Sequence, residues 1–299
     1  MIEERVIDGF KIRTVSICDM IVGIATDIGP RILYIADYRK PHFNLFGVLP
    51  KAGVKTPKGF WRIYGGHRLW SSPEAMPRSY SKDDKPVELN VGKKEVTICG
   101  NPEAENAIRK KITIKPSPES GIQVTHIIEN VGQWPIRFGC WAISVMRRNG
   151  FAIIPLKPSR TDKEGLLPDR HVSLWPYSSL LDERLIYRDG YILVKQNPAI
   201  KHPFKIGTMV NPNWVAYWVD GMMFLKQFPI EDGDYPDYGC NVEVYTNSNM
   251  LELETIGTLK TVNPSEHIEH IEVWKIFEVG DLVSEPDTII KKVESLLNK

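Results

Sequence analysis

The residue whose position points most directly to chemistry is Glu243, within segment 240–246. The segment alternates with period two, so an expected strand carries apolar side chains on one face and Glu243 with Tyr245 on the other. It contains no Lys or Arg that would mark a side facing solvent. A carboxylate in such a place is costly unless it is paired, hydrogen-bonded or used in chemistry. Glu243 is therefore the first candidate catalytic residue.

A second group of ligand-type residues follows two glycines in segment 64–70. Gly65 and Gly66 allow a sharp turn or a close approach of the backbone to a ligand. His67 and Arg68 can bind and protonate an oxygen-rich substrate. The alternative is a glycine-rich turn that carries a structural His–Arg pair.

Aromatic residues surround this group, and we count Tyr64, Trp61 and Trp70 among the expected substrate contacts. An indole ring can stack on the apolar face of a sugar ring.

Two further carboxylates, Glu252 and Glu254, lie two residues apart and so share one face of an expected strand, roughly 7 Å from each other. Such a spacing suits the carboxylate pair of an inverting glycosidase. A solvated strand edge with alternating Glu is the more frequent explanation of such a pattern. Glu254 is the alternative catalytic carboxylate.

The acidic loop 231–238 precedes the strand of Glu243, and its Tyr235 and Asp237 could reach a substrate. Oxygen ligands for calcium are present, but the spacing of an EF-hand is not, which favours a solvated loop. Arg147 ends a long expected strand, where it either contacts an anion or sugar or caps a solvated hairpin. No residues show the spacing of a metal site, and we expect neither metal nor organic cofactor.

These residues must be positioned by strands, because short period-two segments separated by turn signals fill most of the chain. Asp220-Gly221 is the clearest hairpin turn, of type I′. The pattern predicts a large antiparallel all-β fold. The expected strands are 10–17, 20–26, 31–36, 87–90, 95–99, 108–114, 122–129, 136–146, 191–195, 204–210, 214–219, 222–227, 240–246, 250–256 and 267–277.

Three other features complete the expected architecture. Residues 286–298 follow a helix start signal and have one apolar face, so they predict a C-terminal helix that covers a sheet edge. Residues 40–86 and 155–186 break the strand rhythm and are expected to form long ordered loops. With no linker visible, we expect one domain over 1–299.

The bulk composition excludes several classes of protein. Lys and Arg total 38 against 37 Asp and Glu, which argues against a nucleic-acid-binding protein. No window is apolar enough to span a membrane, and the start of the chain lacks the pattern of a signal peptide. Four scattered cysteines fit buried thiols in a reducing compartment, so we expect a cytoplasmic protein. Four glutamines in 299 residues favour a heat-adapted source.

Four motifs together resemble the galactose mutarotase-like (aldose 1-epimerase) superfamily, in an uncharacterised remote branch. Segment 27–35 is similar to an early "G-x-R-I" strand, and 65–70 to the glycine/His/Arg segment near the substrate pocket. Residues 240–243 resemble the strand that bears the catalytic Glu. Residues 263–267 with 273–277 resemble the closing "P-G-E … Y-x-F" strand.

The resemblance implies a supersandwich of twisted antiparallel sheets that binds a sugar. It also implies anomer interconversion, in which a carboxylate takes the C1 hydroxyl proton and a His protonates the ring oxygen. Glu243 would be the base, His67 the acid or a ligand, and Arg68 would hold hydroxyls. The family's further His is missing here, because no His lies between Pro135 and Gly150.

Three functions follow as hypotheses. The first is an enzyme that interconverts sugar anomers, and the second is a carbohydrate-binding protein of the same fold without turnover, which the missing His favours. The third is a glycoside hydrolase or lyase with paired carboxylates. In each the partner is a small sugar or oligosaccharide, and neither a nucleic acid nor a membrane.

Overall fold

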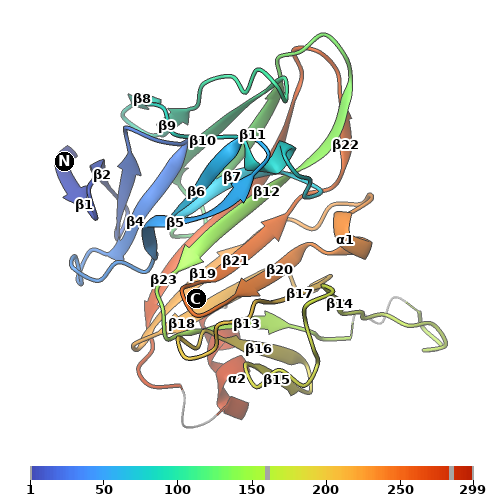
Figure 1. Cartoon of the computed structure of the whole chain (residues 1–299). Helices are drawn as coiled ribbons and strands as arrows, with labels where there is room; N and C mark the ends of the chain where they lie inside the picture. The colour runs from blue at the N-terminus through green and yellow to red at the C-terminus, as the bar shows by residue number, and fades with distance from the viewer. Residues whose placement is uncertain (1, 159–161, 283–285, 298–299) are drawn as a thin grey trace.

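The chain folds into two large antiparallel sheets that pack face to face, as the computed structural model shows for residues 2–158, 162–282 and 286–297 (Figure 1). The prediction of an all-β antiparallel architecture with a C-terminal helix is confirmed. No helix in these ranges is long and apolar enough to cross a membrane.

The first sheet, in these described ranges, has eleven strands, of which β22 (Lys260–Val262) pairs with β12 off the main path. The order along that path is β1 (Ile2–Ile7), β2 (Phe10–Ile17), β3 (Met20–Ala25), β4 (Arg31–Asp37), β7 (His67–Ser72), β12 (Ile136–Met146), β21 (Leu251–Ile256), β20 (Val242–Thr246), β17 (Phe204–Thr208) and β14 (Ser173–Leu174).

The second sheet has ten strands within the same ranges. Their order is β15 (Leu185–Arg188), β16 (Tyr191–Lys195), β13 (Phe151–Pro155), β18 (Trp214–Val219), β19 (Met222–Gln227), β23 (His267–Glu278), β11 (Ile122–Asn130), β10 (Ile108–Pro116), β9 (Val96–Cys99) and β8 (Glu88–Val91). The type I′ hairpin turn is present between β18 and β19, where Asp220 and Gly221 both have positive φ.

The main core fills the space between the two sheets. Val242 and Val244 of β20 and Leu253 of β21 face it from the first sheet, and Val124 and Trp274 from the second. Because successive side chains on a strand point to opposite faces, the residues between these apolar positions are turned to the outer face of the first sheet. That outer face carries the carboxylates that the sequence singled out.

The C-terminal helix α2 (Pro286–Leu297) places Ile289, Val293 and Leu296 against the outer face of the second sheet, beside Phe151 and Trp218. It covers the face of β13 and β18 and not a sheet edge, which corrects the expected location. The expected last residue of the helix, 298, lies outside the described residues.

The expectation of a long loop over 40–86 was wrong for much of its length. Strands β5 (Val48–Thr56) and β6 (Gly59–Gly65) form a separate two-stranded sheet, and β7 follows directly. Pro50 and Gly53 interrupt the period-two pattern in β5, and β7 is buried on both faces, so neither strand shows alternation. The 3-10 turn η1 (Arg78–Tyr80) also lies here.

The other expected loop, 155–186, is irregular in its described part except for its ends and the two-residue strand β14. The strand prediction also omitted β1, β13, β15 and β22, and the one-turn helix α1 (Pro236–Gly239). A single unit over 1–299 stays a prediction.

Candidate functional site

A cleft of about 340 Å³ opens on the outer face of the first sheet. Its floor is built from β7, β12, β17, β20 and β21, which are neighbours in the sheet. Trp61 of β6 and Tyr80 close one side, while Trp175 and Tyr177, which follow β14, close the other. Charged side chains therefore meet aromatic walls in one concave site.

The strand register brings the charged residues of the floor together. Glu243 of β20 lies directly opposite Glu254 of β21, and Tyr245 lies opposite both Glu252 and Lys205. All five side chains project from the face opposite the core, because Val244 and Leu253 of the same strands face inward. Period-two alternation thus brings three carboxylates and one ammonium group together on one face of three neighbouring strands.

Arg68 of β7 lies between two indole rings and one carboxylate. Its Nη2 donates to Glu252 Oε1 at 2.8 Å. Its guanidinium carbon lies 4.6 Å from the ring centre of Trp70 and 5.7 Å from that of Trp61. The side chain is 3% exposed, and its Nε and Nη1 have no hydrogen-bond partner among the described residues. Both of these atoms are buried, so the guanidinium group is held by its ion pair with Glu252 and by the two indole rings.

Lys205 of β17 is the central cation of the site. Its Nζ lies 2.6 Å from Glu243 Oε2 and 3.2 Å from Glu254 Oε2. The same atom lies 4.6 Å from the ring centres of both Trp141 and Trp175. Burial alone would lower the pKa of Lys205, but the two carboxylates together hold it well above its ordinary value. Lys205 is therefore charged at neutral pH.

Glu254 presents a carboxylate to the cleft in a fixed orientation. Trp141 Nε1 donates to its Oε2 at 2.8 Å, the same oxygen that Lys205 contacts. No described residue donates to its Oε1. Burial raises the pKa of Glu254, with Lys205 opposing the shift and Glu252 adding to it. The arrangement suits a carboxylate that accepts a proton from a ligand in the cleft.

Glu243 projects from the same face of the sheet as Glu254 but does not line the cleft. It is fully buried, and it contacts the site through the ammonium group of Lys205. Burial raises its pKa well above the ordinary value; Lys205 opposes this and the Glu254 charge adds to it. The sequence identified Glu243 as a sheltered carboxylate, and the structure pairs it with Lys205, which does line the cleft.

His67 does not lie in the cleft, and the expectation that it shares a site with Arg68 was wrong. Adjacent residues of a strand point to opposite faces, so Arg68 faces the cleft and His67 faces the core. Its Nδ1 is 2.8 Å from Ser144 Oγ, and its Nε2 is 2.7 Å from His126 Nε2. Burial, helped by the neighbouring His126, lowers its pKa well below the ordinary value.

His67, His126 and Glu272 are the one set of described residues whose spacing would allow a metal ion, with ligand atoms within 4.8 Å of one another. Their polar atoms already have partners. His126 Nδ1 donates to the carbonyl of His270 at 2.9 Å. Glu272 Oε1 accepts from Lys226 at 2.9 Å, and Oε2 accepts from Trp274 at 2.7 Å. The set forms a buried hydrogen-bond network between the sheets.

Four other residues that were predicted to contact the substrate do not line the cleft. Tyr64 lies under the guanidinium of Arg31 and packs in an apolar cluster with residues of β2, β3 and β4, separate from the main core. Arg147 lies 3.6 Å from Asp220 at the far end of β12. Tyr235 bonds back to Glu231 within its own loop, and Asp237 lies in the turn α1; neither lines the cleft.

The prediction placed Arg68, Trp70, Trp61 and Glu254 among the site residues, and these four do line one cleft. It missed Lys205, although a lysine between Phe204 and Ile206 carries the same signal as Glu243, a charge inside an apolar strand. The other polar and aromatic lining residues that were missed or assigned to the core are Glu74, Tyr80, Trp141, Trp175, Tyr177 and Tyr245.

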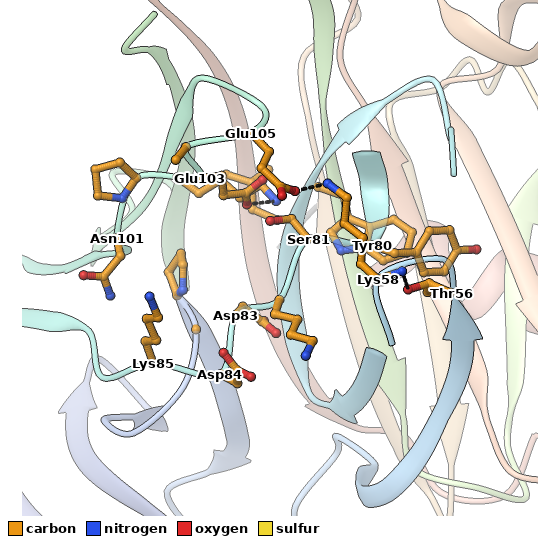
Figure 2. A pocket seen from close by; sticks show the side chains of 18 residues that line it. Thr56, Lys58, Tyr80, Ser81, Asp83, Asp84, Lys85, Asn101, Glu103 and Glu105 are labelled. Carbon is orange, nitrogen blue, oxygen red and sulfur yellow. Dashed lines mark hydrogen bonds and ion pairs between the residues drawn. The ribbon is translucent and has the colours of Figure 1, made fainter. Parts of the chain in front are cut away.

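A second cavity, of about 410 Å³, lies on the other side of Trp70 and Tyr80 (Figure 2). Four of its charged residues form two ion pairs. Lys110 is 2.6 Å from Glu103, and the dashed line at the top of Figure 2 marks the pair of Lys58 and Glu105. Of the residues expected from the sequence, Trp70 alone lines it. The cleft above is therefore the better candidate site.

Comparison with known proteins identifies the fold. A galactose mutarotase-like protein from Lactobacillus casei superposes with a TM-score of 0.55 at 8% identity, covering 89% of this chain and all of that one. A putative mutarotase from Salmonella typhimurium has a TM-score of 0.56 at 10% identity, covering 93% and 94%. A TPR-domain containing protein from Parabacteroides distasonis has a TM-score of 0.60 at 10% identity, covering 92% of this chain and 48% of that one.

The chain thus has the galactose mutarotase-like fold, as the sequence motifs predicted. No protein-family model matches the sequence, and no curated protein matches it. At these identities the likeness concerns the fold alone, so the function must be argued from the cleft.

Proposed function

We propose that the protein binds a sugar in this cleft and interconverts its anomers by acid–base catalysis at C1 and the ring oxygen. The observation that carries the proposal is the position of Glu254, whose Oε2 is fixed by Trp141 and Lys205 while its Oε1 faces no protein donor among the described residues. The neighbours of mutarotase-like fold support the same class of substrate.

The walls of the cleft match the surface of a pyranose. Trp61, Trp70 and Trp141 form a tilted cluster on one side, with ring centres 5.2 Å and 5.5 Å apart. Trp175 and Tyr177 stand half-exposed on the other side. Aromatic faces stack on the C–H face of a sugar ring, while the carboxylates of the floor accept hydrogen bonds from its hydroxyls.

In the proposed reaction, Glu254 takes the proton of the C1 hydroxyl as base. The C1–O bond to the ring oxygen breaks while the carbonyl forms, and Lys205 gives its proton to the departing oxygen. An alkoxide is far more basic than an amine, so this transfer is favourable although the pKa of Lys205 is high. Rotation about C1–C2 and the reverse steps close the opposite anomer and return both protons.

Lys205 takes the place that the sequence had given to a histidine, and Glu254 the place of Glu243. In this scheme Glu243, 2.6 Å from Lys205, holds the ammonium group in position. Polarimetry or proton NMR of freshly dissolved α-glucose and α-galactose tests the proposal. If the anomers of these sugars and of their epimers equilibrate no faster with the protein than in buffer alone, catalysis is ruled out.

A second candidate function is sugar binding without turnover. It is favoured by the absence of any histidine among the described residues that line the cleft. Binding of the same sugars, measured by calorimetry, without faster equilibration would establish it. Paired-carboxylate hydrolysis has less support, since Glu252 is already held by Arg68 at 2.8 Å; release of reducing ends from oligosaccharides would be its sign.

The cytoplasmic location expected from the sequence remains part of this proposal. All four cysteines are free thiols, which supports a reducing compartment. The expected absence of metal and organic cofactor is likewise proposed, because the acid–base scheme uses side chains alone.

A further inference from the structure

The charges that line the cleft do not balance. Two cations, Arg68 and Lys205, face three carboxylates of the lining, those of Glu74, Glu252 and Glu254. Glu243, whose Oε2 lies 2.6 Å from Lys205 Nζ, adds a fourth carboxyl group. With all groups ionised, two positive against four negative charges would give the described site a net charge of −2, and the raised pKa values of Glu243 and Glu254 make this surplus smaller near neutral pH.

Both cations are already paired with carboxylates, so neither is free to bind an anionic ligand. Arg68 is paired with Glu252 at 2.8 Å, and Lys205 lies within 3.2 Å of both Glu243 and Glu254. The phosphate of a sugar phosphate would enter beside four carboxylates without an uncommitted lysine or arginine among the described lining residues. Like charges at such a site disfavour binding, and more strongly because the site is largely buried.

The carboxylates, in contrast, keep oxygen atoms that face no protein donor. Glu252 bonds Arg68 through Oε1, and Glu254 bonds Trp141 and Lys205 through Oε2. Glu74 accepts from the Tyr80 hydroxyl through Oε1. The second oxygen of each of these three has no donor among the described residues. A ligand that brings hydrogen-bond donors with positive charge would satisfy them.

Resting on the sugar-binding function above, we propose that the ligand is an amino sugar, whose protonated amine is selected by the surplus of carboxylates and the aromatic walls. Aromatic faces attract cations as well as apolar C–H groups. Glu74, at the exposed rim, is positioned to meet the amine of an entering ligand, and Glu252 and Glu254 lie deeper.

The electrostatic effect of Glu74 on two other lining residues is consistent with its position in the same cleft. Its charge helps to raise the pKa of Lys205 and, after burial and other charges, that of Tyr177. Lys205 belongs to the floor of the cleft and Tyr177 to the wall formed by the segment after β14, so the charge of Glu74 acts beyond its own segment.

Calorimetry with a matched ligand series tests the inference at about pH 6, where an aliphatic amine is protonated. The series comprises glucosamine, glucose, neutral N-acetylglucosamine and glucose 6-phosphate, with the corresponding galactose compounds as a second set. In at least one set we expect the amine to bind about tenfold more tightly than the parent sugar, and the phosphate to bind weakest.

The variant Glu74→Gln should reduce the ratio of amine to parent affinity, whereas Glu119→Gln, on a distant exposed turn, should leave that ratio unchanged. Equal affinities for amine and parent sugar, or tightest binding of the phosphate, would overturn the amino-sugar inference and leave sugar binding in place. Failure of every ligand in both sets would overturn the proposed function and this inference with it.

Discussion

His67 and Arg68 are neighbours in sequence, but they serve opposite faces of β7. In the pairing with β12, His67 lies across from Ser144 and bonds it inside the core, while Arg68 lies across from Ile143 and reaches Glu252 in the cleft. One peptide unit separates a residue of the sandwich core from a residue of the candidate site. Substitutions at the two positions should therefore have different consequences.

We predict that His67→Ala destabilises the fold and leaves ligand affinity in the folded protein unchanged. The substitution creates a cavity and removes the partner of His126 Nε2, which together should cost about 3 kcal/mol of unfolding free energy. Urea unfolding measures the first effect and calorimetry the second. A stable variant with weakened sugar binding would show that His67 acts on the cleft after all.

Glu254→Gln should lower the rate of anomer equilibration by at least about 100-fold, the usual contribution of a general base. The amide oxygen can still accept from Trp141 Nε1, so the fold should be retained. Polarimetry with a thermal melt distinguishes the two properties. Glu119→Gln is the matched control, and retention of full activity by Glu254→Gln would exclude that carboxylate as the base.

Lys205→Met should be strongly destabilising, by about 3–5 kcal/mol, because it leaves Glu243 and Glu254 buried without their cation. Adding Glu243→Gln to this variant removes one of the two unpaired charges. The double variant should therefore recover part of the loss in urea unfolding. If the two changes are simply additive, the ion pair does not couple these residues.

Trp175→Ala should weaken sugar binding by about 1 kcal/mol through the loss of ring stacking, with little change in stability because the side chain is only half-buried. Trp134 provides the control, since it is 79% exposed and does not line the cleft. Calorimetry on both variants makes the comparison. Equal affinities in the two would remove Trp175 from the binding surface.

The stability of the protein should depend on His270 below neutral pH. Burial lowers the pKa of His270 from 6.5 to about 3, so the unfolded state binds more protons between these values. This contribution is complete above pH 6.5 and is lost as the pH falls toward 3. Relative to His270→Gln, the wild type should lose about 2 kcal/mol of unfolding free energy by about pH 5. Parallel pH profiles of the two proteins would contradict this.

Much of the fold was predictable because alternation is a local property of the sequence. The bounds of β2, β12 and β18 coincide with the predicted ones, since each begins and ends at clear turn signals. Strand β5 was not predictable, because it is largely exposed, contains lysine, proline and glycine, and shifts its register between Leu49 and Gly53, so no regular buried face imposes a period. Its partner β6 buries Trp61 and Ile63, but this short pattern was assigned to the expected loop.

The site was predictable only in part, for a related reason. A charge in an apolar strand identifies a sheltered residue, as for Glu243, but not which neighbouring strand supplies its partner. The pairing of β17 with β20, which brings Lys205 to Glu243, is a contact between segments far apart in the chain. The error at His67 arose from treating adjacent residues as one group, where the two faces of a strand separate them.

The β5–β6 ribbon has a consequence for how this cleft could change over time. It contributes Val54 and Trp61 to the wall, yet it belongs to neither of the large sheets that enclose the main core. Insertions or deletions at its tip, near the turn at 57–58, would reshape the entrance without touching the packing between those sheets. The length of this ribbon is thus a natural point for divergence in ligand size among proteins that keep the same scaffold.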